Sequence, residues 1–536
     1  MKLNNAGIQD QKAWEAAGYA LPRFDREAVR EKTLSSPEWI HFGAGNIFRA
    51  FQANVMQQLL DRKEIETGLL VAEGFDYEII GKLNRKTDDL SILVTLKADG
   101  NVEKTVVGSI VGSFVLDRDN EEEFASLVKI FENPSLKMAS FTITEKGYAL
   151  AGPDGKIFPA IEQDFAAGPD KACSYLGKVV SLLYRRFAAG QLPIAMVSMD
   201  NCSHNGDKVF AAVDGFARNW AKNGLVPETF VQYVNDPQKV SYPWSMIDKI
   251  TPRPDAKVTE ILKNDGVEDL DLIVTSKKTF LSEFVNAEEA QYLVIQDWFP
   301  NGKLPLDKAG VIYTDRETVD KVEKMKVCTC LNPVHTALAV FGCLLGYDLI
   351  SAEMKDDLLK RLAWRVGETE GLPVVVDPGI IRPADFLQEV LTKRIPNPFM
   401  PDTPQRIATD TSQKLAIRFG ETIKAYKASD PAKLSQLKAV PLVFAGWLRY
   451  LLAVDDSGKE FEPSSDPLLG YLKEQMKEVR LGETEGLEEK IRPLLQNAAI
   501  FGVDLYEAGL ADQVTGYLSE MLSGEGAVRK TLEKYI

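Results

Sequence analysis

Residues 38–61, EWIHFGAGNIFRAFQANVMQQLLD, join a short apolar run to a long helical pattern through two glycines. The run at 38–43 has the composition of a buried strand, and from residue 46 apolar side chains recur at the spacing of one helix face. Gly43 and Gly45 stand at the junction, where a tight turn favours residues without a side chain. The stretch predicts a strand, a glycine turn and a helix, the first unit of an α/β fold.

Such a turn is where a nucleotide-binding fold lays a pyrophosphate on a helix N-terminus, because glycine lets the backbone approach and free amides point at the anion. Phe48 occupies the position of the third glycine of the usual fingerprint, so a tight turn without a ligand is the alternative. We expect cofactor contacts from the turn and the first helical residues, namely Gly43, Gly45, Asn46, Ile47 and Phe48.

A second predicted strand, GLLVAEGFD at 68–76, carries two acidic residues at its end, Glu73 and Asp76. Either carboxylate would favour NAD over NADP by accepting hydrogen bonds from an adenosine ribose. The alternative for both is a solvated loop carboxylate. We expect NAD as the cofactor.

The organisation of the chain changes near residue 300. Strand-like runs alternate with helical patterns before it, which indicates a parallel sheet covered on both faces. These runs are EWIHFG, GLLVAEGF, SILVTL, KMASFTIT, IAMVSMDN and LIVTS. The later sequence is almost purely helical, and the segment FPNGKLPLDKAG at 299–310 reads as a linker. We predict a Rossmann-like doubly wound domain at 1–305 and a mostly α-helical substrate and catalytic domain at 306–536.

Composition limits the classes of partner. The 536 residues exceed one usual core, and a formal charge of -15 disfavours nucleic acid and anionic membrane as partners. We expect no signal peptide, no membrane-spanning segment and a cytoplasmic location. The five cysteines form no disulfide pattern, and Cys328 with Cys330 lacks the further ligands of a metal site, so we expect no metal.

One cluster in the helical half carries chemistry: Glu323, Lys326, Asn332 and His335. A lysine, an amide and an imidazole beside an apolar helix are suited to proton transfer from an alcohol. Each has a plainer alternative. Glu323 could form an ordinary i,i+3 ion pair and Lys326 could be an exposed helix lysine. Asn332 could be an N-cap before Pro333, and His335 could be a core histidine.

Several ordered motifs together resemble the polyol-specific long-chain dehydrogenases. The motifs are GAGNIFRAFQA at 43–53, TITEKGY at 142–148, SMDNCSHNG at 198–206, WSMIDKITP at 244–252, YLVIQDWFPNGKLP at 292–305, KVCTCLNPVHTALA at 326–339 and KRIPNPFMPDTPQRIATDTSQKL at 393–415. The resemblance implies a zinc-independent dehydrogenase in which Lys326 is the base and the amides of Asn201 and Asn332 form an oxyanion hole.

The resemblance also implies substrate contacts at His335, Asp248, Arg394 and Lys414, and a proton relay at Glu323. A guanidinium suits a sugar-acid carboxylate, which favours Arg394 for that contact. The alternatives are a loop carboxylate for Asp248 and helix-surface charge for Lys414. No role is assigned to His204.

The spacing departs from the family, because five residues separate Lys326 from Asn332 where four are usual. In a regular helix, six steps of about 100° would leave the two side chains roughly 120° apart. We therefore predict that the helix is interrupted between Cys328 and Asn332 by a break or a π-bulge.

The reaction expected from the resemblance is NAD-dependent, reversible reduction of a ketose-type uronate, D-fructuronate, to D-mannonate. Mannitol 2-dehydrogenase or tagaturonate reductase activity on the same scaffold is the first alternative. The second is a catalytically lapsed NAD-binding regulatory protein. The partners expected are small sugar acids or polyols, and the oligomeric state stays open.

Overall fold

The structure is a computed structural model and describes all residues from 1 to 536. The chain forms two compact units. The first comprises Met1–Lys97 and Asn101–Asp320, and the second comprises Ala98–Gly100 and Lys321–Ile536. The division after Asp320 falls inside helix α10 (Arg316–Met325), whereas the sequence predicts a boundary at 305/306.

The first unit is built on a six-stranded parallel sheet with the order β6-β3-β2-β7-β8-β9. Its strands are β2 (Trp39–Phe42), β3 (Leu69–Glu73), β6 (Ile110–Val115), β7 (Met138–Phe141), β8 (Ile194–Ser198) and β9 (Val240–Ser241). The order runs outward in both directions from β2, so the switch point lies between β2 and β7. This is the doubly wound arrangement, and the predicted fold class is confirmed.

A second sheet is inserted between β3 and β6. The segment SILVTL forms β4 (Ser91–Leu96), which pairs with β5 (Val102–Val107) in an antiparallel hairpin. With β1 (Tyr19–Ala20) and β13 (Phe284–Glu288) this hairpin makes a four-stranded sheet. The prediction that SILVTL joins the main parallel sheet is therefore wrong, because its neighbours along the chain are strands and not crossover helices.

Two smaller sheets complete the strands of the first unit. Strand β10 (Ser245–Asp248) pairs antiparallel with β14 (Tyr292–Gln296), which pairs with β15 (Ile312–Thr314). The predicted strand LIVTS is shorter, β11 (Ile273–Val274), and pairs with β12 (Phe280–Leu281).

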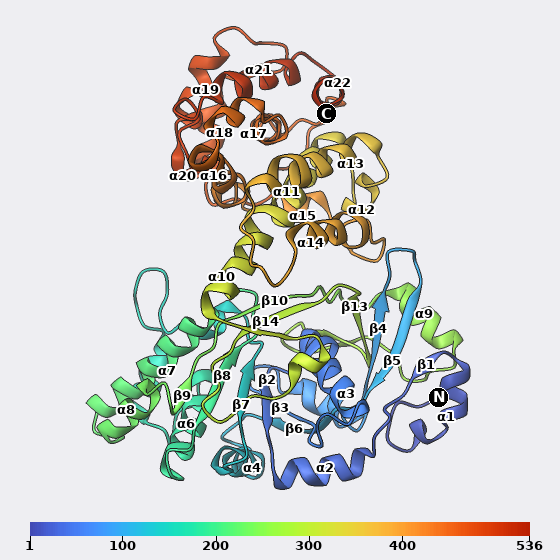
Figure 1. Cartoon of the computed structure of the whole chain (residues 1–536), viewed down its shortest axis with the longest axis vertical. Helices are drawn as coiled ribbons and strands as arrows, with labels where there is room; N and C mark the ends of the chain where they lie inside the picture. Colours follow the sequence, from blue (N-terminus) through green and yellow to red (C-terminus); the bar gives the residue numbers. More distant parts are fainter. The chain divides into compact units, whose positions relative to one another are not determined.

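Helices cover the main sheet (Figure 1), and apolar side chains fill the space between the layers. The helices of the first unit are α1 (Gln11–Ala16), α2 (Arg26–Ser35), α3 (Ala53–Asp61), α4 (Glu121–Glu132), α5 (Pro159–Ala167), α6 (Tyr175–Ala188), α7 (Asn205–Lys222), α8 (Glu228–Asn235) and α9 (Ala256–Asn264). Trp39 and Trp220 are fully buried in this core.

The second unit is helical. After α10 its helices are α11 (Asn332–Leu345), α12 (Ile350–Glu353), α13 (Asp357–Trp364), α14 (Pro383–Glu389), α15 (Pro404–Ile407), α16 (Glu421–Ser429), α17 (Ala439–Tyr450), α18 (Leu469–Met476), α19 (Leu487–Leu495), α20 (Ala498–Phe501), α21 (Ala511–Met521) and α22 (Ala527–Tyr535). Every residue of α17 is buried, and its Gly446 allows the ring of Phe341 in α11 to approach closely. Helices that are apolar all round belong in a core, so α11 and α17 form the centre of this unit.

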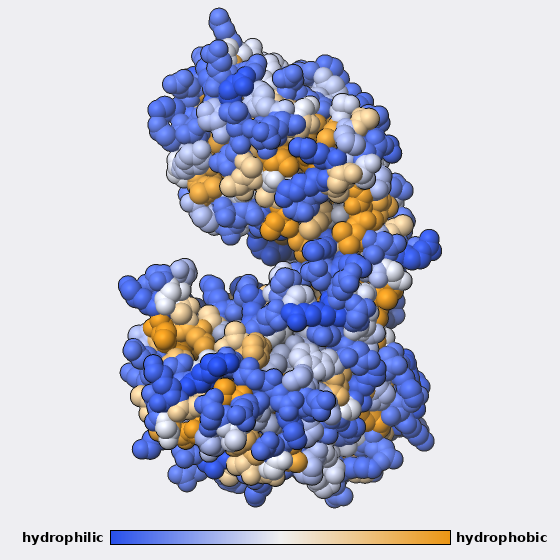
Figure 2. All heavy atoms as spheres, turned by 60° about the vertical axis from the view of Figure 1, so that its left-hand side comes forward, coloured by the Kyte–Doolittle hydropathy of each residue, from blue (hydrophilic) through white to orange (hydrophobic).

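One helical stretch, Arg316–Leu345, is long and apolar enough to cross a membrane by length and composition alone. Core helices that cross no membrane can share this length and composition. In the structure 72 % of the apolar window is buried inside the protein, as in a core helix. Figure 2 shows a surface dominated by hydrophilic side chains, with apolar ones in small separate groups.

Candidate active site

The glycine turn lies at the carboxyl end of β2, at the switch point of the sheet. Gly43 has φ +110°, and its N–H donates to the carbonyl of Ala72 at 2.9 Å. A Cβ at this position would lie 2.5 Å from the carbonyl oxygen of Thr142, the residue that follows β7. Only glycine fits here, because both the backbone conformation and the space exclude a side chain.

The turn has room and hydrogen-bond donors for a dinucleotide. No atom lies within 4 Å of a Cβ built on Gly45. The N–H groups of Gly45, Asn46 and Ile47 donate to no acceptor in the protein, and the buried side-chain oxygen of Asn46 has no partner. These unengaged groups at a helix start fit the pyrophosphate of NAD.

The Phe48 side chain packs beneath the turn. It is 0 % exposed and stacks on His41, with ring centroids 4.4 Å apart. The side chain therefore packs in the core, and the cofactor contact predicted at Phe48 would have to come from its backbone. The fully buried His41 ring contacts the hydroxyls of Ser140 and Thr142, and burial lowers its pKa to about 3.

The two acidic residues predicted to bind the adenosine ribose, Glu73 and Asp76, already accept hydrogen bonds from groups of the protein. The buried Glu73 carboxylate accepts from the N–H groups of Ala44, Phe75 and Asp76, at 2.9, 2.8 and 3.1 Å. Glu73 thus ties β3 to the glycine turn. Asp76 accepts from the hydroxyls of Thr275 and Thr279, each at 2.6 Å, while its other oxygen is buried without a partner. Ribose contacts at these acids remain a prediction.

Phe75, between these acids, is a residue that the sequence analysis does not assign. Its side chain is 65 % exposed, and the ammonium of Lys277 lies 5.2 Å from the ring centroid. An aromatic residue directly after the acid of the second strand is the sequence signal that points to it. An exposed ring beside the ribose acids is suited to stacking on an adenine.

Asn201 is exposed in the loop after β8, and its neighbours hold that loop in place. The Asp200 carboxylate accepts from the N–H groups of Ile143 and Thr144 and from the hydroxyl of Tyr148, at 3.0, 2.9 and 2.6 Å. Burial raises the pKa of Asp200. The buried Asn205 side chain donates to the carbonyls of Ser198 and Asp200. The backbone that presents Asn201 is therefore rigid.

Asp248 is the last residue of β10 and is 6 % exposed, opposite Tyr292 of β14. His204, in the Asn201 loop, takes the left-handed conformation and stacks on Trp244, with centroids 4.0 Å apart. Its ring nitrogen lies 3.3 Å from Asp320.

The predicted interruption of the helix that carries Lys326 is confirmed. Between α10 and α11 runs a π-helix, η6 (Lys326–Cys330), in which the N–H of Leu331 bonds the carbonyl of Lys326 at 3.1 Å. Leu331 has φ -119° and ψ -60°, and a new α-helix starts at Asn332. The 120° separation expected of a regular helix therefore does not apply, and the extra residue is absorbed by the wider turn.

The four residues of the predicted chemical cluster, Glu323, Lys326, Asn332 and His335, lie on this interrupted helix. Lys326 begins the π-helix and is 3 % exposed, and Glu323 lies one turn earlier in α10. The Asn332 side chain forms no hydrogen bond inside the protein and does not serve as the N-cap predicted as its alternative role, which Leu331 takes instead. Its amide is therefore available to a ligand.

His335, one turn into α11, lies in a cationic cluster. Its ring nitrogen is 3.4 Å from the carboxylate of Asp402, which also pairs with Arg406. Burial lowers the pKa of His335 to about 4, Asp402 opposes this, and the charges of Arg418, Arg406 and Arg394 add to it. Arg394 is 4 % exposed. Lys414 donates to the carbonyls of Ile407 and Thr409, and its pKa is lowered by burial and then by Arg418.

The cysteines do not form a metal site. No group of three His, Cys, Asp or Glu side chains in the chain is arranged to hold a metal ion. All five cysteines are free, and burial raises the pKa of Cys330 to about 12, so this thiol does not ionise near neutrality.

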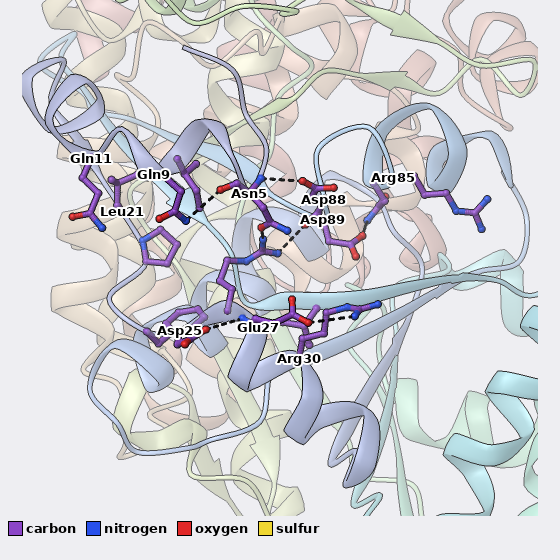
Figure 3. Close-up of a pocket in the computed structure, with 16 residues that line it drawn as sticks. Asn5, Gln9, Gln11, Leu21, Asp25, Glu27, Arg30, Arg85, Asp88 and Asp89 are labelled. Carbon is purple, nitrogen blue, oxygen red and sulfur yellow. Dashed lines mark hydrogen bonds and ion pairs between the residues drawn. The ribbon is translucent and has the colours of Figure 1, made fainter.

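A polar cavity of about 690 Å³ in the first unit lies among the N-terminal segment, α2 and the residues after 84 (Figure 3). None of the predicted site residues lines it. The Arg26 guanidinium at its wall donates to carbonyls of Gly108, Asp88 and Ile110, so protein groups already use its charge.

Two family models match the chain. A mannitol dehydrogenase Rossmann domain matches residues 37–308, and a mannitol dehydrogenase C-terminal domain matches residues 318–522. The chain belongs to the mannitol dehydrogenase family. The resemblance inferred from the ordered motifs is thereby confirmed.

Two relatives align with this chain over nearly their full length. A D-mannonate oxidoreductase of Thermotoga maritima is 49 % identical, with 100 % of this chain and 99 % of that protein covered. A mannitol 2-dehydrogenase of Neosartorya fischeri is 28 % identical over the same shares.

Two solved structures share the fold. A substrate-free D-sorbitol dehydrogenase has a TM-score of 0.80 at 23 % identity and covers 99 % of this chain and 100 % of that one. A Pseudomonas fluorescens mannitol 2-dehydrogenase with NAD and D-mannitol has a TM-score of 0.68 at 24 % identity and covers 100 % and 99 %.

Proposed function

We propose that this chain is an NAD-dependent oxidoreductase that reversibly reduces D-fructuronate to D-mannonate. The observation that carries the proposal is the 49 % identity, over the whole length, with a protein named D-mannonate oxidoreductase. Relatives named mannitol 2-dehydrogenase are 26 % to 28 % identical. The difference favours a sugar acid over mannitol as substrate.

In the reductive direction the Lys326 ammonium gives its proton to the oxygen of the ketone as that oxygen gains negative charge. The family resemblance gives the side-chain amides of Asn332 and Asn201 the role of stabilising that charge. Glu323, one turn from Lys326, passes a proton from solvent to restore the ammonium. Bound NADH supplies the hydride, and in the oxidative direction neutral Lys326 takes the hydroxyl proton.

Residues of the first unit would hold the cofactor. The unengaged amides of Gly45, Asn46 and Ile47 suit the pyrophosphate, and Glu73 fixes their geometry through the N–H of Ala44. Phe75 would stack on the adenine. The substrate contacts proposed from the resemblance are those of His335, Arg394, Lys414 and Asp248.

The test is steady-state turnover of NADH against D-fructuronate, D-tagaturonate and D-fructose. We expect D-fructuronate to give the highest kcat/KM. Lys326→Ala should lower kcat by about 10²- to 10⁴-fold, because it removes the proton donor. Lys360→Ala, at an exposed lysine of α13, is the matched control and should not change kcat. Unchanged turnover in Lys326→Ala would refute the assigned acid.

The same panel separates the alternatives. A preference for D-tagaturonate or D-fructose would indicate one of the other activities of this scaffold. Tight NADH binding without turnover of any compound would indicate a lapsed enzyme. Free cysteines and metabolic relatives support a cytoplasmic location, which we propose with the function.

A further inference from the structure

Arg418 lies in the cationic cluster of the second unit and is assigned no role by the motifs. It belongs to a π-helix, η11 (Ala416–Gly420), and its side chain is half-buried. One nitrogen of its guanidinium donates to the hydroxyl of Thr336. That hydroxyl in turn donates to the carbonyl of Asn332 at 2.9 Å. Arg418 is therefore connected through one side chain to the first turn of α11.

The hydrogen bonds of Arg418 are few compared with a structural arginine of the same chain. Arg186 is fully buried and forms five hydrogen bonds to backbone carbonyls, one for each N–H of a guanidinium. Arg418 forms one, to a neutral hydroxyl, and has no carboxylate within ion-pair distance. Its other nitrogens are not sealed in the core, so its remaining donors can reach a ligand.

Arg418 has a cationic neighbour in Lys414 and forms no ion pair with a carboxylate. Lys414, one helical turn earlier, also has no ion pair and donates only to backbone carbonyls. The nearby carboxylate of Asp402 is shared by Arg406 and His335. Burying a cation without a counter-ion is costly, and that cost is removed when a bound anion supplies the missing charge.

Arg418 also shares a structural feature with two other candidate residues. Lys326 begins the π-helix η6, and Arg394 ends a third one, η9 (Val390–Arg394). The helices η11 and η6 pack against each other. Such turns are rare and concentrate at functional sites, where they redirect a side chain. Arg418 and Arg394 both lie near enough to His335 to lower its pKa, so they belong to one cationic cluster.

We propose that Arg418, in addition to the Arg394 favoured from the sequence, binds the carboxylate of the sugar acid and so makes this site select acids over neutral ketoses. The inference rests on the proposed function and deepens it. A planar guanidinium with free donors matches the two oxygens of a carboxylate. D-fructose, in which a hydroxymethyl group replaces the carboxylate of D-fructuronate, offers Arg418 no charge.

The test compares Arg418→Gln and Arg418→Lys with the wild type on D-fructuronate, D-tagaturonate and D-fructose. Arg418→Gln should lower kcat/KM for the preferred acid roughly 10- to 100-fold, mainly through KM, and leave that for D-fructose unchanged. Arg418→Lys should lose less, since it keeps the charge. Arg382→Gln, at an exposed arginine paired with Asp385, is the matched control and should change neither.

Equal losses on acid and ketose would overturn the inference, as would an unchanged KM for the acid. A wild type that prefers D-tagaturonate would refute the substrate assignment while leaving Arg418 to be judged on that acid. Where D-fructose turns over too slowly, calorimetry replaces it. Arg418→Gln should then lose affinity for D-mannonate in the presence of NAD but keep its affinity for NADH, and retained D-mannonate affinity would overturn the inference.

Discussion

Asn332 combines a fixed backbone with an unengaged side chain. It opens α11 directly after the π-helix, and its carbonyl accepts from Thr336, while its amide bonds nothing in the protein. A residue kept for stability would use its amide within the fold. This one instead has the properties of a donor reserved for the oxygen that becomes charged during the reaction.

Asn332→Ala should therefore affect catalysis and spare the fold. We expect kcat to fall about 10²- to 10³-fold, as for loss of one oxyanion donor. The melting temperature should stay near that of the wild type, because no internal hydrogen bond is lost and alanine favours a helix. Steady-state kinetics and a thermal melt measure the two effects. Asn332→Asp keeps the shape but not the donor, so normal kcat in that variant would contradict the role.

In the glycine turn after β2, the fold requires one glycine and the proposed cofactor requires the other. Gly43 is needed by the fold, because its φ of +110° and the carbonyl of Thr142 exclude a side chain. Gly45 has open space around it and no positive φ, so the folded protein alone would accept alanine there. Because the fold does not require glycine at position 45, we infer that a bound ligand requires the absence of a side chain there.

Gly45→Ala should fold normally and bind NADH weakly, since its new methyl group points into the space proposed for the pyrophosphate. We expect at least about tenfold loss of NADH affinity by fluorescence titration, a modest steric cost. Gly43→Ala should instead lower the melting temperature. If Gly45→Ala binds NADH like the wild type, the pyrophosphate does not lie at this turn.

The sequence predicts more of the backbone than of the side-chain environment. The interruption after Lys326 follows from counting residues, because six regular steps cannot bring the lysine and Asn332 to one face. Phe48 shows the limit, since a motif position reveals that a residue is near a turn but not that its ring packs on His41. The segment SILVTL is a strand as predicted, yet only tertiary pairing places it outside the main sheet.

The sequence does not reveal the proposed role of Arg418, for a related physical reason. In TSQKLAIRFGE its charge looks like the exposed face of a helix. Its significance comes from a missing counter-ion and from Thr336, 82 positions earlier in the chain. Absence of a partner is a property of the folded protein, and no spacing rule reports it.

Charge is distributed unevenly over the molecule as a whole. The chain carries a formal charge of -15, yet in the second unit Arg394, Arg406 and Arg418 lie near enough to the His335 ring, beside Asp402, to lower its pKa. A local cationic site on an acidic protein attracts small anions while the remaining surface repels them. This pattern suits an enzyme for sugar acids.

Burial also lowers the pKa of one histidine in each unit, the fully buried His41 in the first and the half-buried His335 in the second. Both are neutral at pH 7 in the folded protein. An unfolded histidine titrates near 6.5, so below that pH the unfolded chain binds protons that the folded chain does not. Their stabilising contribution is therefore complete above about pH 6.5 and is lost as the pH falls toward about 4 for His335 and about 3 for His41.

At pH 5 this difference costs each unit about 2 kcal/mol of unfolding free energy relative to pH 8. His41→Asn should lower the unfolding free energy at pH 8, because the histidine's hydrogen bonds to Ser140 and Thr142 are lost. It should also abolish the drop in stability between pH 8 and pH 5 in the first unit, and leave that drop unchanged in the second. Calorimetric scans at pH 8 and pH 5 would measure both.

His335→Asn should act on the second unit, and His204→Asn, at a ring that is 52 % exposed, is the control for both. Asp200 and Glu353, whose pKa values burial raises, titrate in the opposite sense, but they are the same in every variant and cancel in the comparison. If His41→Asn loses as much stability between pH 8 and pH 5 as the wild type, His41 is not the group that makes the first unit sensitive to acid.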